Sequence, residues 1–191
     1  WEVKPENHRP GLVVHTAGWP MDNATYGGGF VYHLEDNLVA VGYVVCLNYS
    51  NPHLSPFEEM QRYKTHPEIR KYLDGGKRLA YGARAITAGG LQSLPRLIFP
   101  GGGLIGDDAG FLNAARIKGS HAAIKSGMLA AEHLADGNAS AGWDAKLRAS
   151  KVVAELKKVR NIRPGFNKGL WLGLANAGWE TATVGLSPWT L

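Results

Sequence analysis

The chain is poor in residues that build covalent or metal-linked structure. Its single cysteine, Cys46, excludes an internal disulfide and cannot by itself hold zinc or an iron–sulfur cluster. Its seven histidines form no HxH or HExxH motif, so no metal constellation is recognisable. His53 and His66 stand next to prolines, and we assign both to turns or helix caps.

Long apolar runs and a dinucleotide motif are absent as well. No stretch approaches the roughly 18–20 residues of a membrane-spanning helix, so no bilayer crossing is predicted. No signal or transit peptide is visible, and the chain starts at Trp1 in strand-like sequence, from which we expect a fragment or a processed piece. Pro100-Gly101-Gly102-Gly103 lacks both GxGxxG spacing and a helix directly after it.

Charge is unevenly distributed along the chain. The formal net charge is +5, and residues 140–164 alone carry +5, with Asp144 and Glu155 as their acids. No nucleic-acid-binding motif accompanies this charge, so no nucleic-acid partner is predicted. A solvated helix face, anionic lipid headgroups and an acidic partner protein remain as interpretations. The basic residues are Lys146, Arg148, Lys151, Lys157, Lys158, Arg160 and Arg163.

The first 45 residues resemble strands. Residues 12–15 are apolar, and the runs 26–34 and 38–45 flank turn residues 35–37, which predicts an antiparallel hairpin. Gly27, Gly28 and Gly29 interrupt the first strand of that hairpin and would weaken it. Either a bulge requires them, or a flat ligand lies against the bare backbone; spacing alone favours the bulge.

Helices and further strands are expected downstream. Ser55 as N-cap and Pro56 at the first helical position predict a helix to about residue 63, and residues 67–73 predict a second. Residues 77–85 and 95–99 are typical of strands. A helix over about residues 141–160 would place apolar and basic side chains on opposite faces. The aromatic, glycine-rich residues 165–191 suit either packing or a lipid interface.

Residues 99–134 are the stretch around which the chain is organised. Leu104-Ile105 suggests a short buried strand that ends at Gly106-Asp107, and a helix begins near Gly119-Ser120. A carboxylate at a strand end can accept hydrogen bonds from sugar hydroxyls, while free N–H groups at the next helix start face the same ligand. Such turns are common, so this unit alone leaves the ligand open. The helix face is expected to carry Ile117, Ile124, Met128 and Ala131.

Longer sequence words carry a specific resemblance. GFLN…KGSHAAIKSGMLAAEHL, GWPMDNATYGGGFVYHL, NPHLSPFEEMQRYKTHPEIRKYLDGGKRLAYGARA, GGLQSLPRLIFPGG, VRNIRP and PWTL resemble the electron-transfer flavoprotein–ubiquinone oxidoreductase family. The similarity is nearly continuous over residues 19–134 and patchier afterwards.

The resemblance implies an α/β fold: a partial two-dinucleotide-binding FAD domain with an α+β antiparallel-sheet quinone-binding domain. Residues 1–76 would be part of the ubiquinone-binding domain, 77–136 the C-terminal part of the FAD-binding domain, and 137–191 a helical connection toward a missing iron–sulfur domain. The implied FAD contacts are Gly106, Asp107, Gly119 and Ser120, and the implied quinone contacts are Tyr26, Gly27 and Gly28. No catalytic residue and no metal ligand is expected in this chain.

The same resemblance implies a monotopic, membrane-associated enzyme of the bacterial cytoplasmic or mitochondrial inner membrane. It would pass electrons from reduced electron-transfer flavoprotein through a [4Fe-4S] cluster and FAD to ubiquinone. The GxGxxG motif and the cluster cysteines are not in this chain, so the isolated fragment is expected to be inactive. The alternatives are another FAD-dependent dehydrogenase or hydroxylase of the same superfamily, and a non-catalytic lipid- or protein-binding module.

Three positions depart from the family pattern. Asp107 stands where other members can carry Cys, and this carboxylate strengthens the expected contact with the ribityl chain of FAD. Ala115 replaces a proline, which leaves the loop before the helix less stiff. Gly29 occupies a position where other members may carry Ser, so we expect substitution to be tolerated there.

Overall fold

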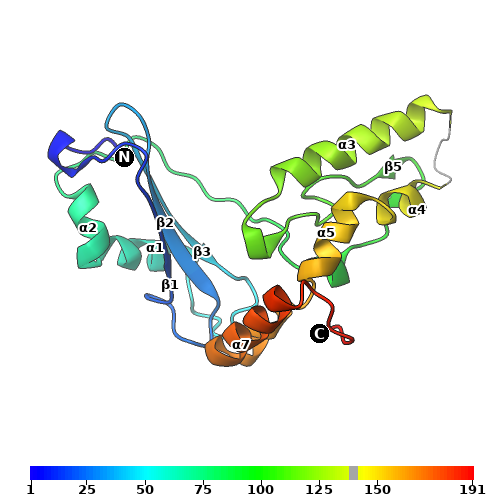
Figure 1. Ribbon diagram of the computed structural model, residues 1–191. Coiled ribbons are helices and arrows are strands. Elements are labelled where there is room, and N and C mark those ends of the chain that lie inside the picture. Colours follow the sequence, from blue (N-terminus) through cyan, green and yellow to red (C-terminus); the bar gives the residue numbers. More distant parts are fainter. Residues whose placement is uncertain (138–141) are drawn as a thin grey trace. The chain divides into compact units, whose positions relative to one another are not determined.

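The computed structural model describes residues 1–137 and 142–191 (Figure 1). The chain divides into two compact units, residues 1–83 and residues 84–191. The helices and small antiparallel sheets of these units are compatible with the predicted α/β class.

The first unit is built on a three-stranded antiparallel sheet. Its strands are β1 (Val13–Ala17), β2 (Gly27–His33) and β3 (Val39–Val45), with β2 in the centre. The turn between β2 and β3 uses positive φ angles at Asp36 and Asn37, which Asp and Asn tolerate better than most residues. The predicted hairpin is therefore confirmed.

Two helices follow the sheet, as expected from their capping residues. In α1 (Pro56–Thr65) the Ser55 hydroxyl accepts the Glu58 N–H at 3.4 Å, and in α2 (Pro67–Leu73) His66 Nδ1 accepts the Glu68 N–H at 3.2 Å. His66 is thus a helix cap, as predicted. A short 3₁₀ turn, η1 (Pro5–Asn7), contacts α2. The core of the unit consists of Val3, Val31, Val39, Tyr63, Ile69 and Leu73.

The second unit is mainly helical. It contains the two-residue strands β4 (Ile98–Phe99) and β5 (Gly102–Gly103), and the helices α3 (Ser120–Ala135), α4 (Trp143–Arg148), α5 (Lys151–Val159), α6 (Ile162–Gly165) and α7 (Leu170–Ala182). The 3₁₀ turns are η2 (Leu91–Ser93), η3 (Ala114–Arg116) and η4 (Phe166–Lys168). Its core consists of Leu97, Ala109, Phe111, Ala122, Trp143, Leu147, Val152, Val153 and Leu156.

Most of the strands expected after residue 76 are not formed. Lys77 makes a single bridge to Glu2, and residues 78–90 have no regular structure and are largely exposed. Leu104-Ile105 is not part of a strand: the Leu104 N–H donates to the Leu97 carbonyl, and Ile105 is 42% exposed. Apolar character alone predicted these strands, but a strand also needs a partner for its backbone.

The glycine run after Phe99 forms a hairpin turn between β4 and β5. Gly101 has φ +83°, a conformation that glycine adopts without a Cβ penalty. Residues 100–103 thus form the turn and the second strand of this hairpin, and no helix follows them directly.

Helix α3 buries a different face from the one expected. It begins at Ser120 after Gly119, as predicted, but its buried residues are Ala122, Ser126 and His133. The apolar face that the spacing pointed to is exposed: Ile117 at 75%, Ile124 at 65% and Met128 at 49%, with Ala131 also exposed. Periodicity identifies an apolar face correctly, but which face a helix buries depends on what lies beside it.

The single helix expected over about residues 141–160 is two helices, and its proposed start at residue 141 lies outside the described residues. α4 ends at Arg148, and α5 starts at Lys151 after Ser150, whose backbone is extended. Of the apolar residues expected near one face, Trp143, Leu147, Val152 and Leu156 are buried and Val159 is half-buried. The five-residue step from Leu147 to Val152 fits two helices better than one, because neighbours on one face of a helix lie three or four residues apart.

The last segment contains α7, a helix that lies in the expected helical connection but whose bounds the sequence analysis did not predict. Arg160 and Asn161 hold it in place: the Asn161 amide donates to Glu180 Oε1 at 3.0 Å, and the Asn176 amide donates to the Asn161 carbonyl at 2.8 Å. Arg160 donates to the carbonyl oxygens of Gly185, Ser187 and Trp189 beyond the helix. The basic segment therefore contributes directly to the fold.

Candidate functional site

The three predicted quinone contacts lie at the start of the central strand. Tyr26 is 45% exposed, and Gly27 and Gly28 are the first residues of β2. Pairing with β3 runs one residue to one, from Gly27 opposite Val45 to His33 opposite Val39. A bulge would place two residues opposite one. The bulge interpretation of these glycines is therefore wrong.

Each glycine instead has a close neighbour within the protein. A Cβ added at Gly28 would lie 2.5 Å from the Thr16 carbonyl oxygen, and one added at Gly27 would lie 2.8 Å from the Val44 carbonyl oxygen. At Gly29 the Tyr63 ring occupies the space, with Cζ 2.2 Å from an added Cβ. The glycines thus let strand and ring pack closely, and the expected tolerance of Gly29 to substitution requires the buried Tyr63 ring to move.

The peptide groups of Gly27 point to the opposite side of the strand from those of Tyr26 and Gly28. Peptide groups of successive residues in an antiparallel strand point to opposite sides. Gly29 and His33 bond toward β1, whereas Tyr26 accepts the Cys46 N–H on the β3 side. The Gly27 peptide groups therefore face the β1 side, one residue beyond Gly28, which is the last β2 residue that β1 pairs with.

Two tyrosines lie close to this position: Tyr63 is buried and Tyr43 is half-buried. The Tyr43 hydroxyl donates to the Gly18 carbonyl at 2.6 Å, the Thr16 hydroxyl donates to the Tyr63 hydroxyl at 3.0 Å, and the two tyrosine rings lie 5.1 Å apart. Burial raises the pKa of both Tyr43 and Tyr63. Both phenols are therefore neutral at physiological pH, and the two rings place aromatic surface near the start of β2.

Of the predicted FAD contacts in the second unit, Gly106 and Asp107 lie in a turn, and Gly119 and Ser120 lie at the start of α3. Gly106 is buried with φ +62°, its N–H donates to Ser126 Oγ at 2.9 Å, and an added Cβ would lie 3.4 Å from Ala123 Cβ. The Gly106-Asp107 turn therefore rests on α3 one turn after that helix begins. Asp107 and Ser120 are exposed.

The start of α3 offers hydrogen-bond donors. The first intrahelical bond there is from the Ala123 N–H to the Gly119 carbonyl, which leaves the N–H groups of residues 120–122 without a helical acceptor. Gly119 itself packs against Leu112, 2.9 Å from an added Cβ. Chemically, an exposed carboxylate such as that of Asp107 can accept hydrogen bonds from sugar hydroxyls, and the free N–H groups of a helix start can donate to an electron-rich edge.

A polar network that the sequence analysis missed lies at the same helix start. Glu155, on α5, accepts from the Asn113 amide at 2.7 Å and pairs with His121 Nε2 at 2.9 Å. The bonds from His121 and Asn113 lower the pKa of Glu155, so it is ionised. In the sequence Glu155 is one acid in a basic segment, and nothing in its local pattern signals contact with residues more than thirty positions earlier.

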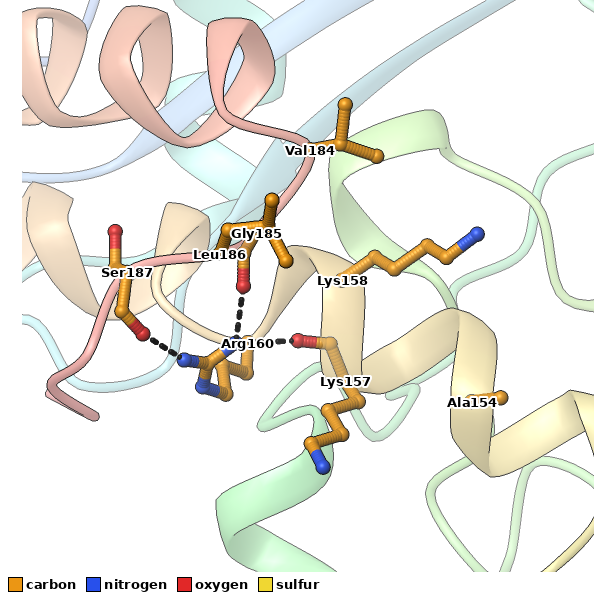
Figure 2. A pocket seen from close by; sticks show the side chains of 8 residues that line it. All are labelled: Ala154, Lys157, Lys158, Arg160, Val184, Gly185, Leu186 and Ser187. Atoms are coloured by element: carbon orange, nitrogen blue, oxygen red, sulfur yellow. Dashed lines mark hydrogen bonds between the residues drawn. The ribbon is translucent and has the colours of Figure 1, made fainter.

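The basic segment flanks an open pocket of about 560 Å³ between α5 and residues 184–187 (Figure 2). Figure 2 shows the Arg160 guanidinium turned toward the carbonyls of Gly185 and Ser187, whereas Lys157 and Lys158 extend their amino groups away from it. Neither lysine forms an ion pair within the described part of the chain. The pocket also presents Val184 and Leu186, 59% and 82% exposed.

Residues 1–137 and 142–191 contain no group of three His, Cys, Asp or Glu side chains placed to hold a metal ion. No helix among them is long and apolar enough to cross a membrane.

The chain is similar in sequence to proteins of a known family. Residues 1–86 match the family described as ETF-QO, ubiquinone-binding. The whole chain is 51% identical to the electron transfer flavoprotein-ubiquinone oxidoreductase, mitochondrial, of Caenorhabditis elegans and covers 35% of it. It is 54% identical over 88% of its length to the Pseudomonas aeruginosa electron transfer flavoprotein-ubiquinone oxidoreductase, covering 32% of that protein, and 49% identical over its whole length to the human mitochondrial one, covering 34%.

The first 86 residues are thus of the ubiquinone-binding class. The chain as a whole belongs to the electron transfer flavoprotein–ubiquinone oxidoreductase family, as the sequence words indicated, and it spans about a third of the length of the curated relatives it matches.

Proposed function

We propose that the full-length protein that carries this chain is an oxidoreductase that passes electrons from reduced electron-transfer flavoprotein to ubiquinone, through a [4Fe-4S] cluster and FAD. The observation that carries the proposal is the roughly 50% identity of the entire chain to proteins with this activity in their names. In this proposal the cluster is bound outside the present chain, and electron-transfer flavoprotein is the soluble partner.

The quinone would bind at the first residues of β2. Gly27 supports this assignment, because its peptide groups face the side of the sheet where β1 no longer pairs. A backbone N–H can donate to a quinone oxygen without adding a group that titrates. The exposed Tyr26 ring would contact the quinone ring, and Gly28 would contribute mainly by allowing β1 and β2 to pack closely.

The FAD would be held at the Gly106-Asp107 turn and the start of α3. FAD supplies the redox chemistry when it is bound, and this chain supplies binding and electrostatics. Asp107 would accept hydrogen bonds from the ribityl hydroxyls, and Gly119 and Ser120 would present the helix N–H groups to the electron-rich edge of the flavin. The packing of Gly106 on Ala123 supports this, since it holds the turn and the helix start against each other.

Membrane association would be peripheral. The exposed side chains Trp171, Leu172 and Leu174 on α7 supply apolar surface for insertion at a lipid interface, at 75%, 61% and 49% exposure. Lys157 and Lys158 supply positive charge for anionic headgroups. The relatives include bacterial and mitochondrial proteins, and the proposed location is the corresponding inner or cytoplasmic membrane.

The test is a purification of the full-length protein, followed by measurement of flavin absorbance, cluster content and quinone reduction. We expect stoichiometric FAD, one [4Fe-4S] cluster, and quinone reduction that depends on reduced electron-transfer flavoprotein. A protein that oxidises or hydroxylates a small substrate without reducing quinone would instead be another FAD-dependent dehydrogenase or hydroxylase. Absence of flavin would indicate a non-catalytic binding module.

A further inference from the structure

We propose that Glu155 is a positioning residue for the FAD site: through Asn113 and His121 it holds the start of α3, and the loop before it, in the conformation that receives the flavin. The inference rests on the proposed function, because it assumes that this helix start faces FAD. It assigns a role to a residue on another helix, outside the turn and the helix start that would contact the cofactor.

The contacts connect three segments that are distant in sequence. The two carboxylate oxygens of Glu155 are shared between Asn113 at 2.7 Å and His121 at 2.9 Å. Asn113 is 1% exposed, and its side-chain oxygen accepts the Arg116 N–H at 3.2 Å. His121 is the second residue of α3. One side chain of α5 therefore ties the base of the loop and the first turn of the following helix together.

The loop between these two anchors needs such support. Asn113 and Lys118 close it with backbone bonds of 2.9 and 3.2 Å, and within it Ile117 has φ +53°. A β-branched residue with positive φ is strained, and strain of this kind persists only where the surroundings hold it. Ala115 adds no stiffness to the backbone. The conformation just before Gly119-Ser120 is therefore maintained by contacts from outside the loop.

The charge of Glu155 also suits its place. The N-terminal end of a helix carries a partial positive charge, so a carboxylate beside the first turn of α3 is favourable. An exposed ion pair alone contributes little, and half of the His121 side chain is in solvent. Asn113 differs from His121 because it is buried. Losing Glu155 would leave its side-chain amide without this acceptor, and a buried polar group without a partner lowers the stability of the fold.

The experiment compares three variants of the full-length holoenzyme. Glu155→Ala removes both bonds, Glu155→Gln keeps the shape and the hydrogen-bonding positions, and Asp144→Ala breaks a similarly exposed ion pair, with Arg148 at 2.6 Å, on α4. The measurements are the dissociation constant for FAD and hydrogen exchange of the amides of residues 113–122. If Glu155→Ala does not fold, His121→Ala is used in its place; it removes only the exposed contact between His121 and Glu155.

We expect Glu155→Ala to bind FAD at least tenfold more weakly, and we expect the amides of its residues 113–122 to exchange hydrogen faster. Glu155→Gln and Asp144→Ala should stay close to the parent protein, and His121→Ala should show the faster exchange. Parent-like FAD binding and exchange in Glu155→Ala would overturn the inference, as would equal losses in Glu155→Ala and Glu155→Gln. A parent protein that binds no flavin would instead refute the proposed function.

Discussion

A glycine in a strand can be required by close packing within the protein or by contact with a ligand, and Gly28 and Gly27 differ in this respect. Gly28 has a backbone oxygen of Thr16 where a side chain would be, which accounts for it without any ligand. Gly27 also lies near a backbone oxygen, but its peptide groups face the side of the sheet beyond the last β1 pair. A valine scan of both positions would disturb the sheet, so smaller changes and a matched glycine are needed to isolate a quinone contact.

Gly27→Ala in the full-length protein should lower quinone reduction about tenfold relative to FAD content. The added methyl group would lie 2.8 Å from the Val44 carbonyl oxygen, so the strand must shift, and that shift displaces the backbone N–H that would donate a bond of about 1 kcal/mol to the quinone. Gly42→Ala is the control, since there too an added Cβ meets the protein itself, 2.2 Å from the Phe30 ring. The measurement is the ratio of quinone reduction to acceptance of electrons from the flavoprotein. An equal fall in that ratio for both variants would show that Gly27 is structural.

Ser120→Ala should lower the flavin midpoint potential. The Ser120 hydroxyl is exposed at the start of α3, and we expect it to donate one bond of about 1 kcal/mol to the negative charge that reduction places on the flavin. Since about 2.3 kcal/mol corresponds to 100 mV for one charge, the shift should be tens of millivolts. A redox titration of the parent and the variant measures it. An unchanged potential would remove Ser120 from the flavin site.

His33 should make the first unit less stable in acid. Its ring is 3% exposed, its Nδ1 accepts the Arg9 N–H at 3.1 Å, and its Nε2 is buried without a partner. Burial lowers its pKa, and the neighbouring His8 and Arg9 add to this effect. The unfolded chain therefore binds a proton at a higher pH than the folded one, so stability falls as the pH drops below the ordinary value of about 6.5.

The measurement is the thermal unfolding midpoint of the full-length protein between pH 7.5 and 5.5. His33→Phe, which keeps an aromatic ring beside Tyr72, should flatten the profile over this range. A parent protein and variant with the same slope would show that another group controls acid sensitivity.

In the proposed membrane contact, helix α5 supplies positive charge and helix α7 supplies apolar surface. α5 has Val152, Val153 and Leu156 in the core, and it carries Lys157 and Lys158 at an open pocket. α7 buries Gly173 and Glu180 and exposes Trp171 and neighbouring leucines. Arg148 and Arg160 already bond within the unit, so they are less available to a membrane than the lysines.

High salt should weaken binding of the full-length protein to anionic vesicles without abolishing it. Each lysine near an anionic surface contributes about 1 kcal/mol at most, within a Debye length of about 8–10 Å. Lys157→Glu with Lys158→Glu should remove most of the salt-sensitive part, whereas Lys4→Glu with Lys77→Glu makes the same charge change in the first unit. Co-sedimentation with vesicles measures both. Complete release by salt alone would mean that no apolar surface inserts.

At the scale of the whole chain, apolar surface is left open in the second unit. Ile117, Ile124 and Met128 form an exposed face on or beside α3, and Trp171 and Leu172 lie on α7. Contiguous exposed apolar surface usually marks an interaction site or a tendency to aggregate. Only one end of the proposed FAD site is encoded in these residues.

Residues 1–191 expressed alone should therefore aggregate, and what stays soluble should lose FAD on desalting and transfer no electrons. The test is flavin absorbance after excess FAD is removed, beside the full-length protein as the positive control. A stoichiometric yellow fragment would contradict the incomplete-site interpretation.

Local signals determined much of the first unit and, in the second unit, the start of α3. The hairpin, the N-caps of α1 and α2 and the start of α3 were predictable, because a turn or cap is specified by residues a few positions apart. The candidate quinone and FAD residues came from longer words that resemble a family. Residues 77–85 and 104–105 were predicted wrongly as strands, because an apolar run does not reveal whether a neighbouring strand exists.

The sequence by itself thus determined the family, the hairpin and the helix caps. Tertiary structure decided what each residue touches: that Tyr63 covers Gly29, that α3 buries Ala122 and not Ile124, and that Glu155 reaches Asn113 and His121. The physical reason is range. Caps, turns and periodicity act over a few residues of chain, whereas burial and side-chain pairing depend on which distant segments meet in space.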